Sequence, residues 1–219
     1  MRYKHVFAVC AYKDSPYLEQ CIRSLKAQTV PSHIIICTST PSSYIDRLAW
    51  KYGLQVCVRR GESGIKDDWN FAYSMAEGEL VTIAHQDDMY HRDYSARLLA
   101  AHRRYPDMTV FTTDYVIVKQ GALITGDAML WIKRILRTPL RFPQMNDRAW
   151  VKKLAFVLGN PICCPATTYH KAVLGEPFVR SEYSFALDWD NLVRLAEEPG
   201  RFICCLLYTS PSPRDRSLS

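Results

Sequence analysis

Every residue from Val6 to Ala11 is apolar. A strand with one solvated face alternates apolar and polar residues, whereas an uninterrupted apolar run of this length fits a strand that is covered on both faces. Short, largely apolar runs recur at Ile34–Cys37, Leu54–Val58 and Leu80–Ala84, with segments of helix length between them. This alternation predicts an α/β fold in which helices cover both faces of a mostly parallel sheet.

The segments between these runs carry helix start and stop signals. Pro16 occupies a first-turn position, and apolar residues recur at helical spacing from Leu18 to Leu25. A second helix is expected to end at Gly53, because glycine accommodates the left-handed backbone beyond a helix terminus. A third helix is expected around Asp68–Ala76. The chain is therefore predicted to repeat a strand-to-helix unit through its first half.

Polar residues follow three of the predicted strands directly. They are Tyr12, Lys13 and Asp14 after the first strand, Thr38, Ser39 and Thr40 after the second, and His85, Gln86, Asp87 and Asp88 after the fourth. Ligands of open α/β sheets bind at the carboxyl ends of the strands, so these three clusters are expected to converge on one edge.

The adjacent carboxylates Asp87 and Asp88 offer the hard oxygen ligands that Mg²⁺ or Mn²⁺ prefers. The alternative is that they cap a helix beginning near Asp93, but their position directly after an apolar strand favours the metal. A Rossmann dehydrogenase is disfavoured because no GxGxxG follows the first strand. A P-loop enzyme is disfavoured because no GxxxxGK[ST] occurs in the chain.

Taken together, these residues resemble the family 2 glycosyltransferases, which have the GT-A fold, from Val6 to about Trp189. The resemblance rests on the Ala11-Tyr12 turn, residues 17–25 with Gln28-Thr29, Asn70, Gly78-Glu79 and Gln86-Asp87-Asp88. It implies a transferase that takes a sugar from a nucleotide-diphosphate donor. By this resemblance the donor is bound by Ala11, Tyr12, Thr38, Ser39, Asn70, His85 and Gln86, and Asp87, as principal ligand, holds the divalent metal with Asp88.

The resemblance also implies a catalytic base, Asp188, at the position where the family usually has Glu-Asp followed by an aromatic residue. A carboxylate there would take the proton of the attacking hydroxyl while the metal stabilises the departing diphosphate. A single in-line displacement would invert the anomeric configuration. The alternative is that Asp188 or Asp190 caps a helix over Asn191–Glu197.

Two positions depart from the family pattern. The segment after the second strand carries the hydroxyls of Thr38 and Ser39 where the family usually has acidic residues, which leaves the nucleotide base open. His85 stands where an aspartate often opens the metal motif, and it either contacts the ribose or diphosphate or only fills space.

We expect a nucleotide-sugar-binding half over residues 1–118 and an acceptor-side portion over residues 119–204. From Cys205 to Asp215 the sequence resembles a translated sequencing-library adapter. Residues 205–219 are therefore expected to be a non-native tail and the fold to be incomplete at its C-terminus. The alternative is a flexible tail rich in serine and proline.

The net charge of +6 favours anionic partners. Basic residues concentrate among apolar ones between positions 133 and 153: Lys133, Arg134, Arg137, Arg141, Arg148, Lys152 and Lys153. Such a segment can lie on an anionic membrane, which would suit a lipid-linked acceptor, or form a solvated helix face. No motif for nucleic acid binding accompanies the charge.

The location and function follow from these points. The eight cysteines form no CxxC pattern, no signal peptide is recognisable, and no run of eighteen apolar residues occurs. A cytoplasmic protein with reduced thiols is therefore expected, either free or peripheral to the inner face of the membrane. The predicted function is that of an inverting glycosyltransferase that acts on a glycan or lipid-linked acceptor in cell-surface polysaccharide synthesis. The alternatives are a nucleotide-sugar-binding module without turnover and a nucleotidyltransferase.

Overall fold

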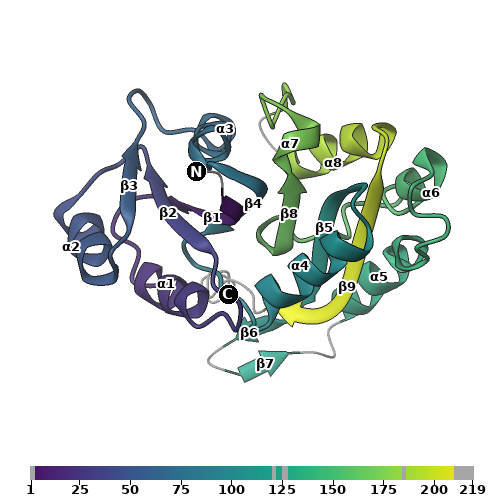
Figure 1. Cartoon of the computed structure of the whole chain (residues 1–219), viewed down its shortest axis with the longest axis horizontal. Helices are drawn as coiled ribbons and strands as arrows, with labels where there is room; N and C mark the ends of the chain where they lie inside the picture. Colours follow the sequence, from purple (N-terminus) through teal and green to yellow (C-terminus); the bar gives the residue numbers. More distant parts are fainter. Residues whose placement is uncertain (1–2, 120–121, 125–127, 184–185, 210–219) are drawn as a thin grey trace.

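The structure is a computed structural model that describes residues 3–119, 122–124, 128–183 and 186–209. In this part of the chain the main sheet has seven strands in the order β3-β2-β1-β4-β8-β5-β9 (Figure 1). These strands are β1 (Tyr3–Ala11), β2 (His33–Thr38), β3 (Gln55–Val58), β4 (Gly78–His85), β5 (Met108–Tyr115), β8 (Thr167–His170) and β9 (Arg201–Thr209). A separate hairpin pairs β6 (Ile117–Lys119) with β7 (Ala122–Ile124).

Helices cover both faces of this sheet. The α-helices are α1 (Leu18–Lys26), α2 (Ser43–Tyr52), α3 (Ile65–Met75), α4 (Tyr94–Arg104), α5 (Ala128–Leu136), α6 (Ala149–Leu154), α7 (Lys171–Leu174) and α8 (Leu187–Glu197). Two 3-10 helices are η1 (Thr138–Arg141) and η2 (Cys164–Ala166). Among the described residues, none of the helices combines the length and apolarity that crossing a membrane requires.

The sheet is mostly parallel. Strand β1 pairs in parallel with β2 and β4, β2 with β3, and β5 with β9. Strand β8 runs antiparallel to both of its neighbours, β4 and β5. The predicted fold class, a GT-A-type mostly parallel sheet flanked by helices, is therefore confirmed.

The apolar run in β1 is explained by its two covered faces. Val6 and Ala8 pack into one core cluster with side chains of α3 and α8, and Phe7 and Val9 pack into a second cluster with α1, α2 and α4. All four side chains are completely buried. Successive side chains of a strand point to opposite faces, so only a continuous apolar sequence can serve both clusters.

The second half of the chain is interleaved with the first. Strands β8 and β9 come from beyond the expected boundary at residues 118/119, yet they flank β5 in the main sheet. Strand β9 also crosses the boundary expected at Cys205, because it continues beside β5 as far as Thr209, with a register shift after Cys205. Residues 205–209 are apolar, aromatic or β-branched, which suits a strand. Residues 210–219 of the expected tail lie outside the described part of the chain.

Several residues of the basic stretch are structural. Asp114, at the end of β5, accepts hydrogen bonds from Arg134 (Nε to Oδ2, 2.9 Å) and from Arg137, whose side chain is fully buried. Lys152 is also fully buried and donates to the carbonyl oxygens of Glu198 and Gly200 just beyond α8. Neither the membrane interpretation nor the solvated helix face applies to Arg137 or Lys152.

We expect Asp114→Asn to destabilise the protein strongly. The substitution keeps the side-chain shape but leaves the Arg137 guanidinium buried beside a neutral amide, and removing one partner of a buried ion pair typically costs about 3–5 kcal/mol. Urea unfolding followed by circular dichroism measures the loss. Lys153→Ala, which removes an ion pair between the exposed side chains of Lys153 and Glu197, is the control and should barely move the midpoint. An unchanged midpoint for Asp114→Asn would contradict the assigned role.

Candidate active site

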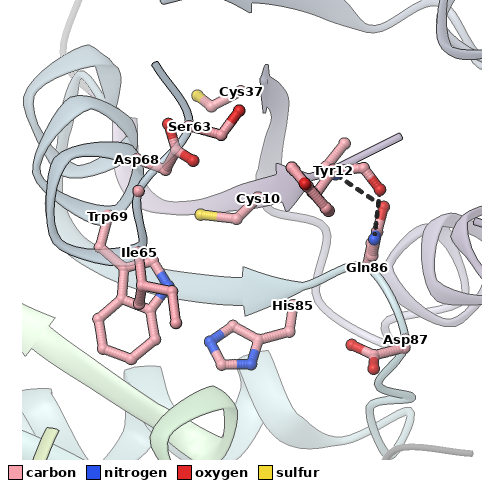
Figure 2. A pocket seen from close by; sticks show the side chains of 12 residues that line it. Cys10, Tyr12, Cys37, Ser63, Ile65, Asp68, Trp69, His85, Gln86 and Asp87 are labelled. Atoms are coloured by element: carbon pink, nitrogen blue, oxygen red, sulfur yellow. Dashed lines mark hydrogen bonds between the residues drawn. The ribbon is translucent and has the colours of Figure 1, made fainter. Parts of the chain in front are cut away.

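A cavity of about 410 Å³ opens at the carboxyl ends of β1 and β4 (Figure 2). A volume of this size is typical of sites for small molecules. The cavity is lined by Cys10, Ala11, Tyr12, Cys37, Ser63, Gly64, Ile65, Asp68, Trp69, His85, Gln86 and Asp87. Five predicted site residues are among them: Ala11, Tyr12, His85, Gln86 and Asp87.

Gln86 fixes the backbone at the mouth of this cavity. The Tyr12 N–H donates to Gln86 Oε1 (3.0 Å), and Gln86 Nε2 donates to the Tyr12 carbonyl oxygen (2.9 Å). This reciprocal pair continues the β1–β4 ladder beyond its last strand residues. Lys13, which follows, has a left-handed backbone (φ 54°) that non-glycine residues rarely adopt. The chain therefore turns sharply here and leaves the Tyr12 ring half exposed at the cavity.

His85, Asp87 and Asp88 bring three possible metal ligand atoms within 4.8 Å of one another. Both carboxylates are buried, and His85 Nδ1 lies 3.8 Å from Asp88 Oδ2. The Trp69 ring stacks on the His85 ring, with centroids 5.3 Å apart, and holds it against the cavity wall. Two neighbouring buried carboxylates repel each other, and a divalent cation bound between them relieves that repulsion. The donor set therefore fits the expected Mn²⁺ or Mg²⁺.

A neutral thiol lies beneath this group. Cys21, in α1, donates from Sγ to the His85 carbonyl oxygen (3.3 Å). Burial raises the pKa of Cys21 well above its usual value, and the charges of Asp88 and Asp87 raise it further. The thiol therefore stays protonated and supports the end of β4 without adding negative charge.

Thr38, the last residue of β2, and the following Ser39 and Thr40 are not among the residues that line the cavity in the described part of the chain. Thr38 is buried and accepts a hydrogen bond from the Thr40 N–H (3.0 Å). Ser39 donates to Oδ2 of Asp68 (3.0 Å), whose other oxygen pairs with Arg59 Nε (2.7 Å). A carboxylate therefore does reach the neighbourhood of the second strand, but it comes from α3.

The cavity-lining residues of α3 and of the loop before it were not predicted from the sequence. Ser63, Gly64, Ile65, Asp68 and Trp69 all line the cavity. The available indication was the glycine-containing loop that opens a helix with acidic residues in its first turn. Such a helix start between two parallel strands has to lie near the carboxyl edge of the sheet.

Asn70 ties the two halves of the chain together and is not among the cavity-lining residues of the described structure. Its Nδ2 donates to the Val179 carbonyl oxygen (2.9 Å), and its Oδ1 accepts from the Val179 N–H (2.7 Å). Both polar atoms of the amide are thus engaged with the segment that precedes α8.

Asp188 lies in the first turn of α8, half-buried, and also outside the lining set of the described cavity. Asn160 Nδ2 donates to its Oδ2 (2.7 Å). Burial raises the pKa of Cys164 well above its usual value, and the charges of Asp188 and, more weakly, Asp88 add to the shift. Both carboxylates are therefore near Cys164. Ala186, with a left-handed backbone (φ 56°), precedes the helix, a strained conformation of the kind that clusters at functional sites.

Comparison with known proteins agrees with this geometry. The model of glycosyl transferase family 2 matches residues 6–159. S. aureus TarS 1-349 has a similar structure, with a TM-score of 0.67 and 17% identity over 95% of this chain and 60% of that chain. The Pyrobaculum calidifontis mannosyltransferase PcManGT, solved with GDP-Man and Mn²⁺, has a TM-score of 0.65 and 15% identity over 97% of this chain and 57% of that chain.

A third similar structure is glucosyl-3-phosphoglycerate synthase from Mycobacterium tuberculosis with Mn²⁺ and UDP-glucose, at a TM-score of 0.60 and 14% identity over 94% of this chain and 70% of that chain. No curated protein matches the sequence. The chain spans less than two thirds of TarS 1-349 and PcManGT. The family match contains the strands that border the cavity and the carboxylates Asp87 and Asp88, while Asp188 lies beyond it. This chain therefore belongs to glycosyl transferase family 2 and has the GT-A fold of that family.

Proposed function

We propose that this chain is an inverting glycosyltransferase that moves a sugar from a nucleotide-diphosphate donor to a hydroxyl of a glycan or lipid-linked acceptor, in cell-surface polysaccharide synthesis. The observation that carries the proposal is the cavity at the carboxyl ends of β1 and β4, with two buried carboxylates and His85 at its edge. Similar structures were solved with UDP, with GDP-Man and Mn²⁺, and with UDP-glucose and Mn²⁺.

The donor would occupy this cavity. Asp87, Asp88 and His85 would hold a divalent cation, which supplies positive charge for the diphosphate when it is bound. The half-exposed Tyr12 ring offers an apolar face to the nucleotide base, and Asp68 offers carboxylate oxygens to base or ribose donors. Ile65 and Trp69 give the cavity an apolar part of its wall.

Asp188 would act as the base. Asn160 donates to its Oδ2, so Oδ1 is the oxygen that would accept the proton of the acceptor hydroxyl. Loss of that proton as the oxygen attacks the anomeric carbon makes the hydroxyl a competent nucleophile. Attack from the side opposite the diphosphate inverts the configuration. A nucleotidyltransferase would need a basic loop after β1 that binds phosphate. Lys13 follows β1, but its Nζ lies over the Tyr12 ring, 5.1 Å from the ring centroid. This alternative therefore receives no support.

The first prediction concerns donor binding. With Mn²⁺ present, one member of a nucleoside diphosphate panel should raise the melting temperature, since a ligand at about 100 times its Kd stabilises by about 2.7 kcal/mol. Asp87→Asn should abolish the metal-dependent shift. Asp46→Asn, at an exposed position in α2, is the matched control and should keep it. If no nucleotide shifts the folded wild-type protein, the donor site is wrongly assigned.

The second prediction concerns the base. Asp188→Asn retains the side-chain size, so the nucleotide shift should persist while sugar transfer falls about 10²- to 10⁴-fold. Release of nucleoside diphosphate from the sugar donor in the presence of acceptor measures the rate. Asp190→Asn, in the same helical turn, should transfer at close to the wild-type rate. Normal turnover by Asp188→Asn would exclude the base role, and a wild-type protein that binds the donor but never transfers would indicate a binding module.

A membrane-bound acceptor is supported by exposed apolar side chains on the basic segment. Trp131 in α5 and Trp150 in α6 are 64% and 57% exposed, with Lys133 and Arg148 nearby in sequence. Trp50 in α2 is 88% exposed at the opposite end of the molecule (Figure 1). Tryptophan beside basic residues is typical of surfaces that lie on anionic lipid.

The third prediction is that the protein sediments with vesicles containing phosphatidylserine, less so at high salt, and not with neutral vesicles. The double variant Trp131→Gln/Trp150→Gln should lower vesicle affinity by roughly tenfold, because apolar area is lost from the interface. Trp50→Gln should have no effect. Equal binding of all three proteins would exclude this surface as the lipid contact.

A further inference from the structure

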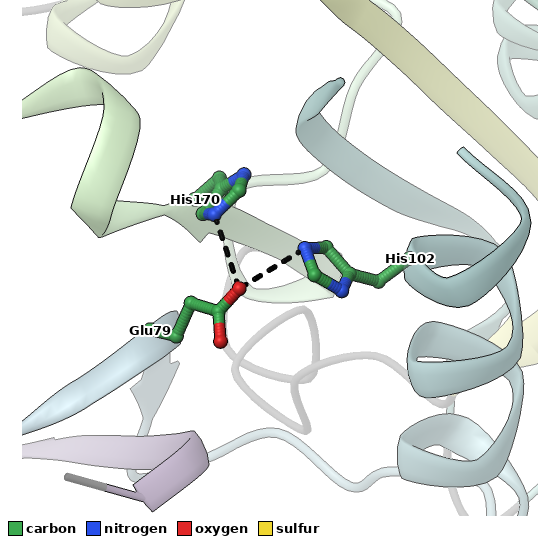
Figure 3. Close-up of side chains that lie close together, drawn as sticks. All are labelled: Glu79, His102 and His170. Carbon is green, nitrogen blue, oxygen red and sulfur yellow. Dashed lines mark ion pairs between the residues drawn. The ribbon is translucent and has the colours of Figure 1, made fainter. Parts of the chain in front are cut away.

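A second cluster of potential metal ligands lies at the other edge of the sheet (Figure 3). Glu79 is at the amino end of β4, about 20 Å along an extended strand from the cavity at its carboxyl end. His170 ends β8, which runs antiparallel to β4, and His102 is in the last turn of α4. Three elements far apart in sequence therefore present these side chains to one point.

The distances within this cluster suit ligation. Glu79 Oε1 lies 3.4 Å from His102 Nε2 and 3.5 Å from His170 Nε2. Ligands about 2.0–2.1 Å from a tetrahedral zinc ion are about 3.3 Å from one another. Both histidines are buried, while the Glu79 side chain is 31% exposed and leaves a path from solvent.

Hydrogen bonding fixes what the His170 ring presents. His170 Nδ1 lies 2.8 Å from the Met108 carbonyl oxygen, which can only accept, so Nδ1 carries the hydrogen. In the neutral ring Nε2 then directs its lone pair at the Glu79 carboxylate. His102 Nε2 is buried beside the same oxygen and makes no hydrogen bond in the described structure. A lone pair facing a carboxylate is repulsive unless a cation or a proton lies between them.

We propose that Glu79, His102 and His170 form a zinc site. Two imidazole nitrogens and one carboxylate oxygen are a common protein ligand set for Zn²⁺. The surroundings are those of metal-binding residues, because a backbone carbonyl orients His170 and Lys4 Nζ engages the second carboxylate oxygen, Oε2 (2.7 Å), which leaves Oε1 for the metal.

The ion would act as a structural clamp. It would join the end of α4 to β4 and β8, where β8 is inserted antiparallel between parallel strands. Burial lowers the pKa of His102, with Lys4 and His170 adding to the effect and Glu79 opposing it. The competing arrangement has a proton on His170 Nε2 and an ion pair with Glu79.

The test uses Co²⁺ as a visible probe, on protein without a histidine tag and in an Asp87→Asn/Asp88→Asn background that removes the other carboxylate pair. We expect one equivalent of Co²⁺ to give the intense absorption of a tetrahedral site, displaced by Zn²⁺, and Zn²⁺ to raise the melting temperature. His102→Gln should weaken Zn²⁺ binding at least roughly 100-fold, since even loss of a residue that only orients a ligand weakens binding 10- to 100-fold. His91→Gln, which removes an exposed histidine, should change neither signal.

The outcomes separate the two arrangements. Tetrahedral Co²⁺ absorption that disappears in folded His102→Gln establishes the site. Absence of that absorption in the parent protein, or equal Zn²⁺ affinity in His102→Gln and the parent, overturns it in favour of the protonated ion pair. Glu79→Gln, at a partly exposed position, provides a second ligand variant if His102→Gln does not fold.

Discussion

The structure depends on the burial of β1 on both faces. Residues Val6 to Val9 are completely buried, and their side chains pack alternately into two core clusters. A polar group without a hydrogen-bond partner would therefore be strongly unfavourable at the centre of this strand. His5 is a buried polar residue directly before this stretch, and both of its ring nitrogens are hydrogen-bonded, to the hydroxyls of Ser32 and Thr82. Burial lowers the pKa of His5 to about 3, which keeps the ring neutral. Chemistry is thereby confined to the two ends of the strands.

Side-chain amides hold those ends in place. Gln86 bridges to the Tyr12 backbone, Asn70 bridges to Val179, and Asn160 holds Asp188. An amide both donates and accepts and carries no charge, so it can complete a backbone pairing without altering the field of the site. The carboxylates Asp87 and Asp88 then remain for the proposed metal. This division of roles explains why polar residues at one sheet edge need not all be ligand-binding residues.

The sequence was sufficient to predict the fold and to predict that residues following β1 and β4 lie at one edge of the sheet. The unbroken apolar run in β1 and the acidic pair after β4 are local patterns, and both were interpreted correctly as far as the fold is concerned. The antiparallel insertion of β8 was not predictable, because Thr167–His170 is short and held by hydroxyl contacts such as Thr82 to Thr168 (2.5 Å). Nor does sequence distinguish an amide that faces a ligand from one that pairs with backbone, as Asn70 does.

The remaining limit on prediction from the sequence is that residues of one site lie far apart along the chain. Asp68 reaches the cavity only because of the path of the preceding loop, and His102 and His170 meet at Glu79 from separate elements, so no motif spacing reveals either arrangement. Asp188 depends on long-range placement too, since the segment before α8 is fixed by the Asn70 bridge to Val179. The proposed donor site is thus built on β1, β4 and the start of α3, whereas the proposed base is held by tertiary contacts of loops. Loops tolerate change better than core strands, which would allow acceptor use to vary while the proposed donor site is retained.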